Sequence, residues 1–198
     1  MRIVGGKNRG RTIIAPSGKT TRPTSDRARE SIFNILKSAP WSPPLDGANV
    51  IDIFAGSGAL GLEALSRGAA FCLFVETEPK ARAAIRENTM TMGLGGCTRL
   101  HRRDATKLRI EPGNLRGPFT HIFLDPPYHK NLARPVLRKL GEQGLIADSA
   151  VIVYEMGKEE EPNLGTPRAL PRGRGYKIHD TRIWGAAKVV FMGLADIG

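Results

Sequence analysis

The tetrapeptide Asp125-Pro126-Pro127-Tyr128 holds residue types that could act on an amino group. It directly follows the apolar run Ile122-Phe123-Leu124, which places it at the carboxyl end of an expected buried strand. Because proline has no N–H and a fixed φ, the Pro126 carbonyl is left as an acceptor beside the Asp125 carboxylate. Two acceptors can hold both hydrogens of an exocyclic base amine and turn its lone pair towards a methyl donor, while Tyr128 offers an aromatic face to the base. The alternative is a proline turn capped by an aspartate.

A glycine turn precedes this tetrapeptide in the chain. Residues 50–54 form an apolar run that breaks into Ala55-Gly56-Ser57-Gly58 and resumes at Leu60 with helical spacing. Gly56, Gly58 and Gly61 match the G-x-G-x-x-G fingerprint, and Glu76 ends the next apolar run, where an acid can bind the two hydroxyls of a ribose. This pattern suits NAD and any other adenosine cofactor.

Two further acids distinguish between these cofactors. Asp52 lies at the end of the first apolar run, beside the glycine turn. A carboxylate there would repel a pyrophosphate but suits the ammonium and sulfonium charges of S-adenosylmethionine. Asp104, followed by Ala105, is positioned to accept a hydrogen bond from an adenine amine, although it could equally be a helix-capping or solvated acid. The sequence therefore favours S-adenosylmethionine.

The elements that position these residues alternate between strand and helix patterns. Strands are expected at 49–54, 71–76, 97–101, 121–124, 150–155, 176–183 and 188–194. Helical patterns separate the first five, and a short turn joins the last two. This order predicts an α/β, Rossmann-like fold with a mostly parallel seven-stranded sheet and a terminal antiparallel hairpin. Ligands of such sheets bind at the carboxyl ends of the strands, where each motif above falls.

The charge of the chain is concentrated near its start. The net charge is +11, and residues 1–37 contain nine Lys or Arg against two acidic residues, which indicates a polyanionic partner. Residues 2–14 read as a basic β-hairpin, an appendage rather than part of the core, and a helix follows from about residue 24. We therefore predict an RNA-contacting extension over residues 1–40 and a catalytic domain over 41–198. The RNA-binding candidates are Lys7, Arg9, Arg11, Arg22 and Arg27.

Several classes of protein are disfavoured. Two cysteines and four histidines form no disulfide framework or metal-binding pattern, and no apolar stretch approaches the roughly 18 residues of a membrane span. We expect a cytoplasmic monomer without a metal.

The chain resembles the bacterial 16S rRNA (guanine-N2) methyltransferase family of the RsmD type over essentially its full length. The resemblance is carried by residues 2–11, 21–30, 33–36, 52–58 and 125–128. It implies a class I S-adenosylmethionine-dependent methyltransferase that modifies the N2 of one guanine in assembled or partly assembled small ribosomal subunits. It also implies that residues 55–58 lie along the methionine and ribose, Glu76 binds the ribose, Asp104 approaches the adenine, Asp125 and Pro126 hold the target amine, and Tyr128 packs against the guanine.

Three alternatives remain open at this point. The nearest is an adenine-N6 or other amino methyltransferase that uses the same tetrapeptide on another nucleic acid. A nonenzymatic RNA-binding or ribosome-assembly module could keep the cofactor fold. An NAD-dependent oxidoreductase is disfavoured because it leaves the tetrapeptide and the basic start of the chain without a role.

Overall fold

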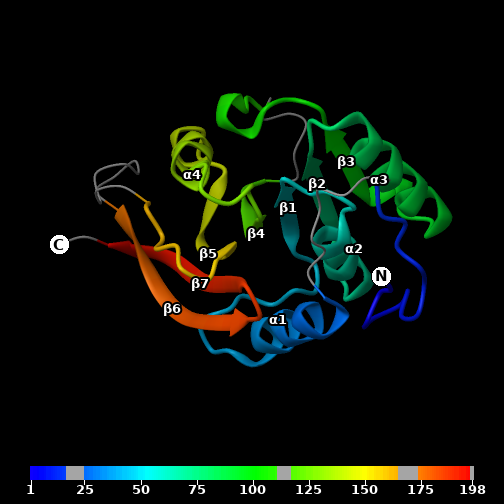
Figure 1. Cartoon of the computed structure of the whole chain (residues 1–198), viewed down its shortest axis with the longest axis horizontal. Coiled ribbons are helices and arrows are strands. Elements are labelled where there is room, and N and C mark those ends of the chain that lie inside the picture. The colour runs from blue at the N-terminus through cyan, green and yellow to red at the C-terminus, as the bar shows by residue number, and fades with distance from the viewer. Residues whose placement is uncertain (17–24, 111–116, 165–173, 197–198) are drawn as a thin grey trace.

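The molecule is built around a seven-stranded sheet with the strand order β3-β2-β1-β4-β5-β7-β6. The computed structural model describes residues 1–16, 25–110, 117–164 and 174–196. The strands are β1 (Asn49–Ile53), β2 (Phe71–Val75), β3 (Thr98–His101), β4 (Phe119–Leu124), β5 (Ile146–Gly157), β6 (Arg174–Trp184) and β7 (Ala187–Asp196). The first five strands are parallel, and β7 pairs antiparallel with both β5 and β6. The predicted sheet with its terminal hairpin is confirmed (Figure 1).

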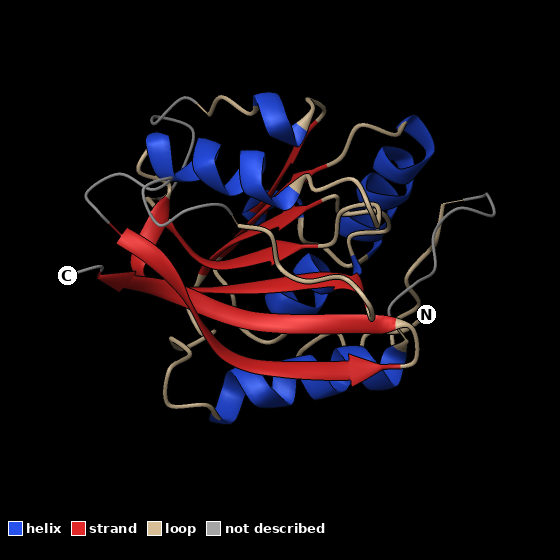
Figure 2. Cartoon of the chain, turned by 60° about the vertical axis from the view of Figure 1, so that its left-hand side comes forward, coloured by secondary structure: helices blue, strands red, loops and turns tan. Residues whose placement is uncertain are grey.

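Helices cover both faces of the sheet. They are α1 (Asp26–Ser38), α2 (Ala59–Ser66), α3 (Pro79–Thr91) and α4 (Ala133–Glu142), with short 3-10 helices η1 (Gly95–Cys97) and η2 (Ala105–Lys107). Figure 2 shows the sheet between α4 on one side and α1 on the other. Alternate side chains of β1 separate two apolar clusters: Ile51 and Ile53 belong to the cluster that contains α4, and Val50 to the one that contains α1 and α2. A strand buried on both faces needs the continuous apolar run that the sequence shows.

Four strands begin earlier than the sequence predicts: β7 by one residue, β4 and β6 by two, and β5 by four. β4 starts at Phe119, whose N–H donates to the Leu145 carbonyl at 2.8 Å, and the β4–β5 register shifts between Phe119 and His121. β5 starts at Ile146, although Asp148 and Ser149 within it are exposed. Polar, solvent-facing residues at the start of a strand read as a loop in the sequence.

The N-terminal segment packs into the core instead of forming the expected appendage. Its two arms meet at an isolated antiparallel bridge between Arg2 and Thr12, without a regular strand in this segment. Ile3 and Ile13 are 1% and 2% exposed and lie in the same apolar cluster as α1 and α2. The division of the chain at residue 40 into an RNA-contacting extension and a catalytic domain stays a prediction.

A buried carboxylate holds this segment against the helices. Glu63 of α2 is fully buried and accepts hydrogen bonds from the Val4 N–H at 2.9 Å and the Arg67 Nε at 2.7 Å. The Nε of Arg29, from α1, lies 3.6 Å from the same carboxylate. One acid thus joins the start of the chain to α1 and α2. A buried carboxylate is costly unless hydrogen-bond donors and cations surround it, and these contacts provide them.

Candidate functional site

The loop after β1 is bent sharply onto the end of β2. Phe54 has a φ of +61°, in the left-handed region that a bulky residue seldom adopts, and the N–H groups of Phe54 and Ala55 both donate to the Val75 carbonyl at 3.0 and 3.2 Å. Gly56 and Gly58 have φ values of +55° and +78°, which glycine adopts without strain. Backbone strain held at such a loop is typical of a binding site.

The third glycine of the fingerprint serves packing. A Cβ on Gly61 of α2 would lie 2.4 Å from the Phe74 ring and 2.6 Å from the Cys72 sulfur. Only a glycine therefore lets α2 approach β2 this closely. The opposite holds at Gly56, where a Cβ would meet no atom within 4 Å, so the backbone of the loop is open on that side.

Asp52 is buried beneath this loop. It is 2% exposed and accepts a hydrogen bond from the Gly61 N–H at 2.9 Å, so it satisfies one of the free amides at the start of α2. Burial raises the pKa of Asp52 to about 8, in spite of this hydrogen bond, and the charge of Glu76 adds to the increase. The raised pKa favours the protonated carboxyl, whereas the sequence reasoning expected a carboxylate at this position. Its role in cofactor binding stays a prediction.

Glu76 and Asp104 lie at the ends of the next two strands. The Glu76 carboxylate accepts from the Gly56 N–H and the Glu78 N–H, both at 2.8 Å, and so contacts the glycine loop. Asp104 caps η2 by accepting from the N–H and hydroxyl of Thr106 at 2.9 and 2.8 Å, and the N–H hydrogen bond lowers its pKa. Asp104 is exposed, whereas Ala105 is 2% exposed. The capping alternative is what the contacts show; adenine binding by these residues stays a prediction.

The tetrapeptide adjoins the glycine loop because β1 and β4 are neighbours. Ile53 pairs with Leu124, and the Asp125 N–H donates to the Ile53 carbonyl at 3.3 Å. Asp125 and Tyr128 are half-buried and Pro126 is buried. The structure therefore brings Asp125, Pro126 and Tyr128 next to residues 54–58, as expected for ligands at strand carboxyl ends.

Glu155 of β5 is a site residue that the sequence analysis missed. It is 6% exposed, and the Tyr128 hydroxyl donates to its Oε1 at 3.2 Å. Burial, and next the charge of Glu155, raise the pKa of Asp125 well above its usual value. A single carboxylate inside the otherwise apolar run 150–156 was the available signal.

Asn88 of α3 is a second missed residue. Its side chain is fully buried, donates to the carbonyls of Ser57 at 3.1 Å and Ile14 at 3.0 Å, and accepts from the Ile14 N–H at 2.8 Å. This amide joins the glycine loop to the N-terminal segment. An amide group suits the position because it can both donate and accept.

The basic residues predicted to bind RNA are mostly at the surface. Lys7, Arg9, Arg11 and Arg27 are at least partly exposed, and Arg11 also donates to the Thr91 carbonyl at 3.0 Å. Arg22 lies outside the described residues.

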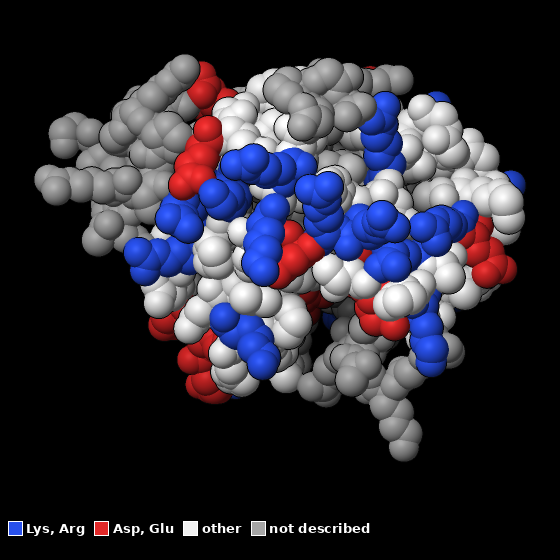
Figure 3. All heavy atoms as spheres, turned by 90° about the horizontal axis from the view of Figure 1, so that it is seen from above, with Lys and Arg blue, Asp and Glu red and all other residues white. Residues whose placement is uncertain are grey.

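Other basic side chains lie on the face formed by η2 and α4. Figure 3 shows Lys and Arg gathered in a band across this face. The basic residues of these two elements and the loops beside η2 that are at least partly exposed are Arg102, Arg103, Lys107, Arg109, Arg134, Arg138 and Lys139. None of them is among the residues that the sequence predicts to bind RNA.

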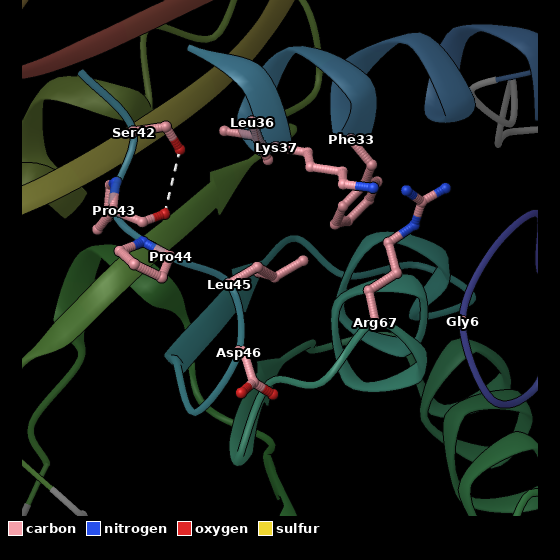
Figure 4. Close-up of a pocket in the computed structure, with 10 residues that line it drawn as sticks. All are labelled: Gly6, Phe33, Leu36, Lys37, Ser42, Pro43, Pro44, Leu45, Asp46 and Arg67. Atoms are coloured by element: carbon pink, nitrogen blue, oxygen red, sulfur yellow. Dashed lines mark hydrogen bonds between the residues drawn. The ribbon is translucent and has the colours of Figure 1, made fainter. Parts of the chain in front are cut away.

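A separate cavity lies at the opposite end of β1 from the glycine loop. It has a volume of about 530 Å³ and is bounded by α1, residues 42–46 and Arg67 (Figure 4). The Arg67 guanidinium lies 5.0 Å from the centre of the Phe33 ring, and Lys37 points towards the same ring. None of the predicted site residues lines this cavity.

Two negative findings apply to the part of the chain that the structure describes. None of its helices is long and apolar enough to cross a membrane. It also contains no group of three or more His, Cys, Asp or Glu side chains that could hold a metal ion.

Comparison with known proteins places the chain in a family. Residues 1–191 match the family described as Conserved hypothetical protein 95. The chain is 35% identical to "Ribosomal RNA small subunit methyltransferase D" of Escherichia coli (strain K12), over 93% of this chain and 85% of that protein. It is 37% identical to "Putative rRNA methyltransferase YlbH" of Bacillus subtilis (strain 168), over 81% and 85% respectively.

A solved structure agrees with these relatives. The "Putative methyltransferase yhhF from Escherichia coli" superimposes with a TM-score of 0.76 at 31% identity, covering 98% of this chain and 97% of that one. The chain is thus a member of the Conserved hypothetical protein 95 family, the RsmD type of ribosomal RNA methyltransferase.

Proposed function

We propose that this protein transfers a methyl group from S-adenosylmethionine to the exocyclic N2 of one guanine in 16S rRNA of the small ribosomal subunit. The observation that carries the proposal is the position of Asp125-Pro126-Pro127-Tyr128 directly beside the glycine loop, in a chain of this family. A methyl donor in the loop and an amine at the tetrapeptide would then lie next to each other.

The residues at the loop fit S-adenosylmethionine. The open side of Gly56 gives a ligand room to lie against the backbone, and Glu76 is already at the loop, where it would bind the ribose. Asp52 would face the positive end of the ligand, and Asp104 with Ala105 would border the adenine. A cationic group beside Asp52 would favour loss of its proton and would then be held by the resulting carboxylate, whereas a pyrophosphate would gain no such contact, which disfavours NAD. The bound cofactor supplies an electrophilic methyl group.

The tetrapeptide would bind and orient the target amine of the guanine. The Asp125 carboxylate and the Pro126 carbonyl would each accept one N–H of the guanine amine, and Tyr128 would stack on the ring. These contacts direct the nitrogen lone pair at the methyl group. Methylation leaves a cationic nitrogen whose proton is acidic, and a carboxylate with a raised pKa is a suitable acceptor for it.

The exposed cations provide the contacts that a large RNA substrate requires. Lys7, Arg9, Arg11 and Arg27 would bind phosphates on the N-terminal side. The band on η2 and α4 offers further contacts, and Lys130 follows the tetrapeptide closely in the chain. Arg22 keeps its proposed role from the sequence pattern alone.

Transfer of labelled methyl groups tests this function. Small subunits that lack the modification would be incubated with the protein and labelled S-adenosylmethionine, and the RNA digested and mapped by mass spectrometry. We expect N2-methylguanine at one position of 16S rRNA. Label in an adenine amine would support the alternative amino methyltransferase, and tight cofactor binding without any label would support the assembly module.

A further inference from the structure

Glu155 is a buried carboxylate that the proposed reaction does not yet use. It lies on β5, next to β4, where Leu124 pairs with Tyr154 in the parallel register. The residues that follow these partners, Asp125 and Glu155, therefore emerge side by side at the carboxyl edge of the sheet. Glu155 is 6% exposed, so its carboxylate is largely shielded from solvent at the site.

Glu155 also contacts the aromatic residue of the tetrapeptide. The Tyr128 hydroxyl donates to Glu155 Oε1 at 3.2 Å, which joins the β4 loop to β5. The next residue along the chain makes a second connection to this region. The His129 N–H donates to Glu160 Oε1 at 2.5 Å, and Glu160 Oε2 accepts from the Gly157 N–H at 2.6 Å. Glu155 of β5 and Glu160, which follows that strand, thus hold the loop after β4 through Tyr128 and His129.

We infer that Glu155 is a positioning residue for methyl transfer: it fixes the plane of the Tyr128 ring against the target base and strengthens Asp125 as a proton acceptor. The inference rests on the proposed function. In the reaction the amine lone pair forms the N–C bond, the C–S bond breaks with its electrons remaining on sulfur, and the proton leaves the nitrogen for the Asp125 carboxylate. Glu155 touches neither the base nor the methyl group.

Three substitutions separate the two effects. Glu155→Ala removes the charge and the acceptor for Tyr128, whereas Glu155→Gln keeps an acceptor oxygen and removes only the charge. Tyr128→Phe keeps the ring and removes its hydroxyl. The matched control is Glu159→Gln, an exposed carboxylate just beyond the same strand.

We expect Glu155→Ala to lower kcat roughly 10- to 100-fold, because a small misplacement of a reacting group has effects of that order. The affinity for S-adenosylmethionine should stay within about twofold, since the glycine loop is untouched. Adding Tyr128→Phe to Glu155→Ala should cost little more than Glu155→Ala alone, because the hydrogen bond that Tyr128→Phe removes is already broken.

Glu155→Gln should change the pH dependence of kcat. The titratable groups at this point are Asp52 from β1, Asp125 from the β4 loop and Tyr128. Without the neighbouring negative charge the Asp125 carboxyl loses its proton at lower pH, so the acid limb of the kcat profile should move to lower pH. Glu159→Gln should leave the profile in place.

A readout without turnover keeps the inference separate from the proposed function. The chain has three tyrosines, so fluorotyrosine NMR gives three signals, and Tyr128→Phe identifies the one that belongs to Tyr128. Glu155→Ala should shift that signal towards the position of a solvent-exposed tyrosine. An unchanged signal, or a Glu155→Gln enzyme with wild-type kcat and an unmoved acid limb, would overturn the inference. A wild-type enzyme that does not label guanine would instead contradict the proposed function, while the NMR result would still decide the role of Glu155.

Discussion

Asp52 and Asp104, two acids of the candidate site, differ in environment and therefore in pKa. Asp52 lies beneath the loop and accepts from the Gly61 amide, whereas Asp104 is exposed and accepts two hydrogen bonds from Thr106. Burial raises the pKa of the first, and hydrogen bonding lowers that of the second. The same residue type thus lies beneath the loop with a raised pKa and near η2 with a lowered one.

We predict that Asp52 makes the stability of the protein fall as the pH rises. Its carboxyl is ionised above about pH 4 in the unfolded chain but keeps its proton to a pKa of about 8 in the folded one, so the folded state binds more protons between these values. The free energy of unfolding of the wild type, relative to Asp52→Asn, should therefore fall by about 2 to 3 kcal/mol over two pH units in this window.

Denaturant unfolding at about pH 5.5 and 7.5 measures this difference. Asp46→Asn, at an exposed position, is the control and should give curves parallel to the wild type. A wild type that gains stability relative to Asp52→Asn as the pH rises would contradict a raised pKa at Asp52.

Individual residues of the site could be predicted where a motif carries them. The glycine loop, Glu76 and the tetrapeptide are found beside one another, because parallel strands bring their carboxyl ends to one edge. Glu155 and Asn88 could not be found in this way, since their contacts depend on the β4–β5 register and on how α3 lies against the loop. The sequence marks Glu155 only as a carboxylate in an apolar run, and it does not show which side chain Glu155 contacts.

At the scale of elements, the contact between α2 and β2 fixes the shape of the glycine loop. It depends on Gly61, which faces the Phe74 ring and the Cys72 sulfur. We predict that Gly61→Ala pushes α2 away from the sheet and lowers the free energy of unfolding by about 1 to 3 kcal/mol, as overpacking does. Because Asp52 accepts from the Gly61 N–H, the same change should also weaken S-adenosylmethionine binding.

Gly96→Ala in η1 is the matched control. A Cβ on Gly96 meets no atom within 4 Å, so stability should change by no more than about 0.5 kcal/mol. Thermal unfolding and calorimetric titration measure both variants. Equal stability of the Gly61→Ala and Gly96→Ala variants would show that α2 and β2 can accommodate a Cβ at Gly61, and would contradict the prediction.

The sequence patterns predict that a strand exists more accurately than they predict the residue at which it begins. All seven strands lie where the apolar runs predict them, but β4, β5, β6 and β7 begin one to four residues earlier. Exposed Asp148 and Ser149 obscured the start of β5, because a strand at the surface need not be apolar. The two arms of the predicted N-terminal hairpin do pair, through the Arg2–Thr12 bridge and three backbone hydrogen bonds, but Ile3 and Ile13 also pack into the core, so the segment is not an appendage.

At the scale of the whole molecule, the N-terminal segment combines a buried anchor with an exposed cationic surface. Ile3 and Ile13 hold it in the core, while Lys7 and Arg9 are exposed. We predict that Lys7→Glu with Arg9→Glu weakens RNA binding and flattens its salt dependence, by about 0.7 to 0.9 in log–log slope for each phosphate that the protein no longer neutralises.

Binding of 16S rRNA at several salt concentrations tests this prediction. Lys177→Glu, on β6, provides a single-charge control with a smaller expected effect. A double variant whose slope equals that of the wild type would remove the N-terminal segment from the RNA interface.

The most direct test of the proposed chemistry is methyl transfer by Asp125→Ala, with cofactor affinity measured in parallel. Asp125 is proposed to hold the amine and take its proton, so we predict that formation of N2-methylguanine falls by at least about 10²-fold. Burial makes its charge unfavourable for folding, so the variant should remain folded and bind S-adenosylmethionine within a few-fold of the wild type. Near wild-type transfer, or a loss of transfer that follows a loss of cofactor binding, would contradict the proposed role of Asp125.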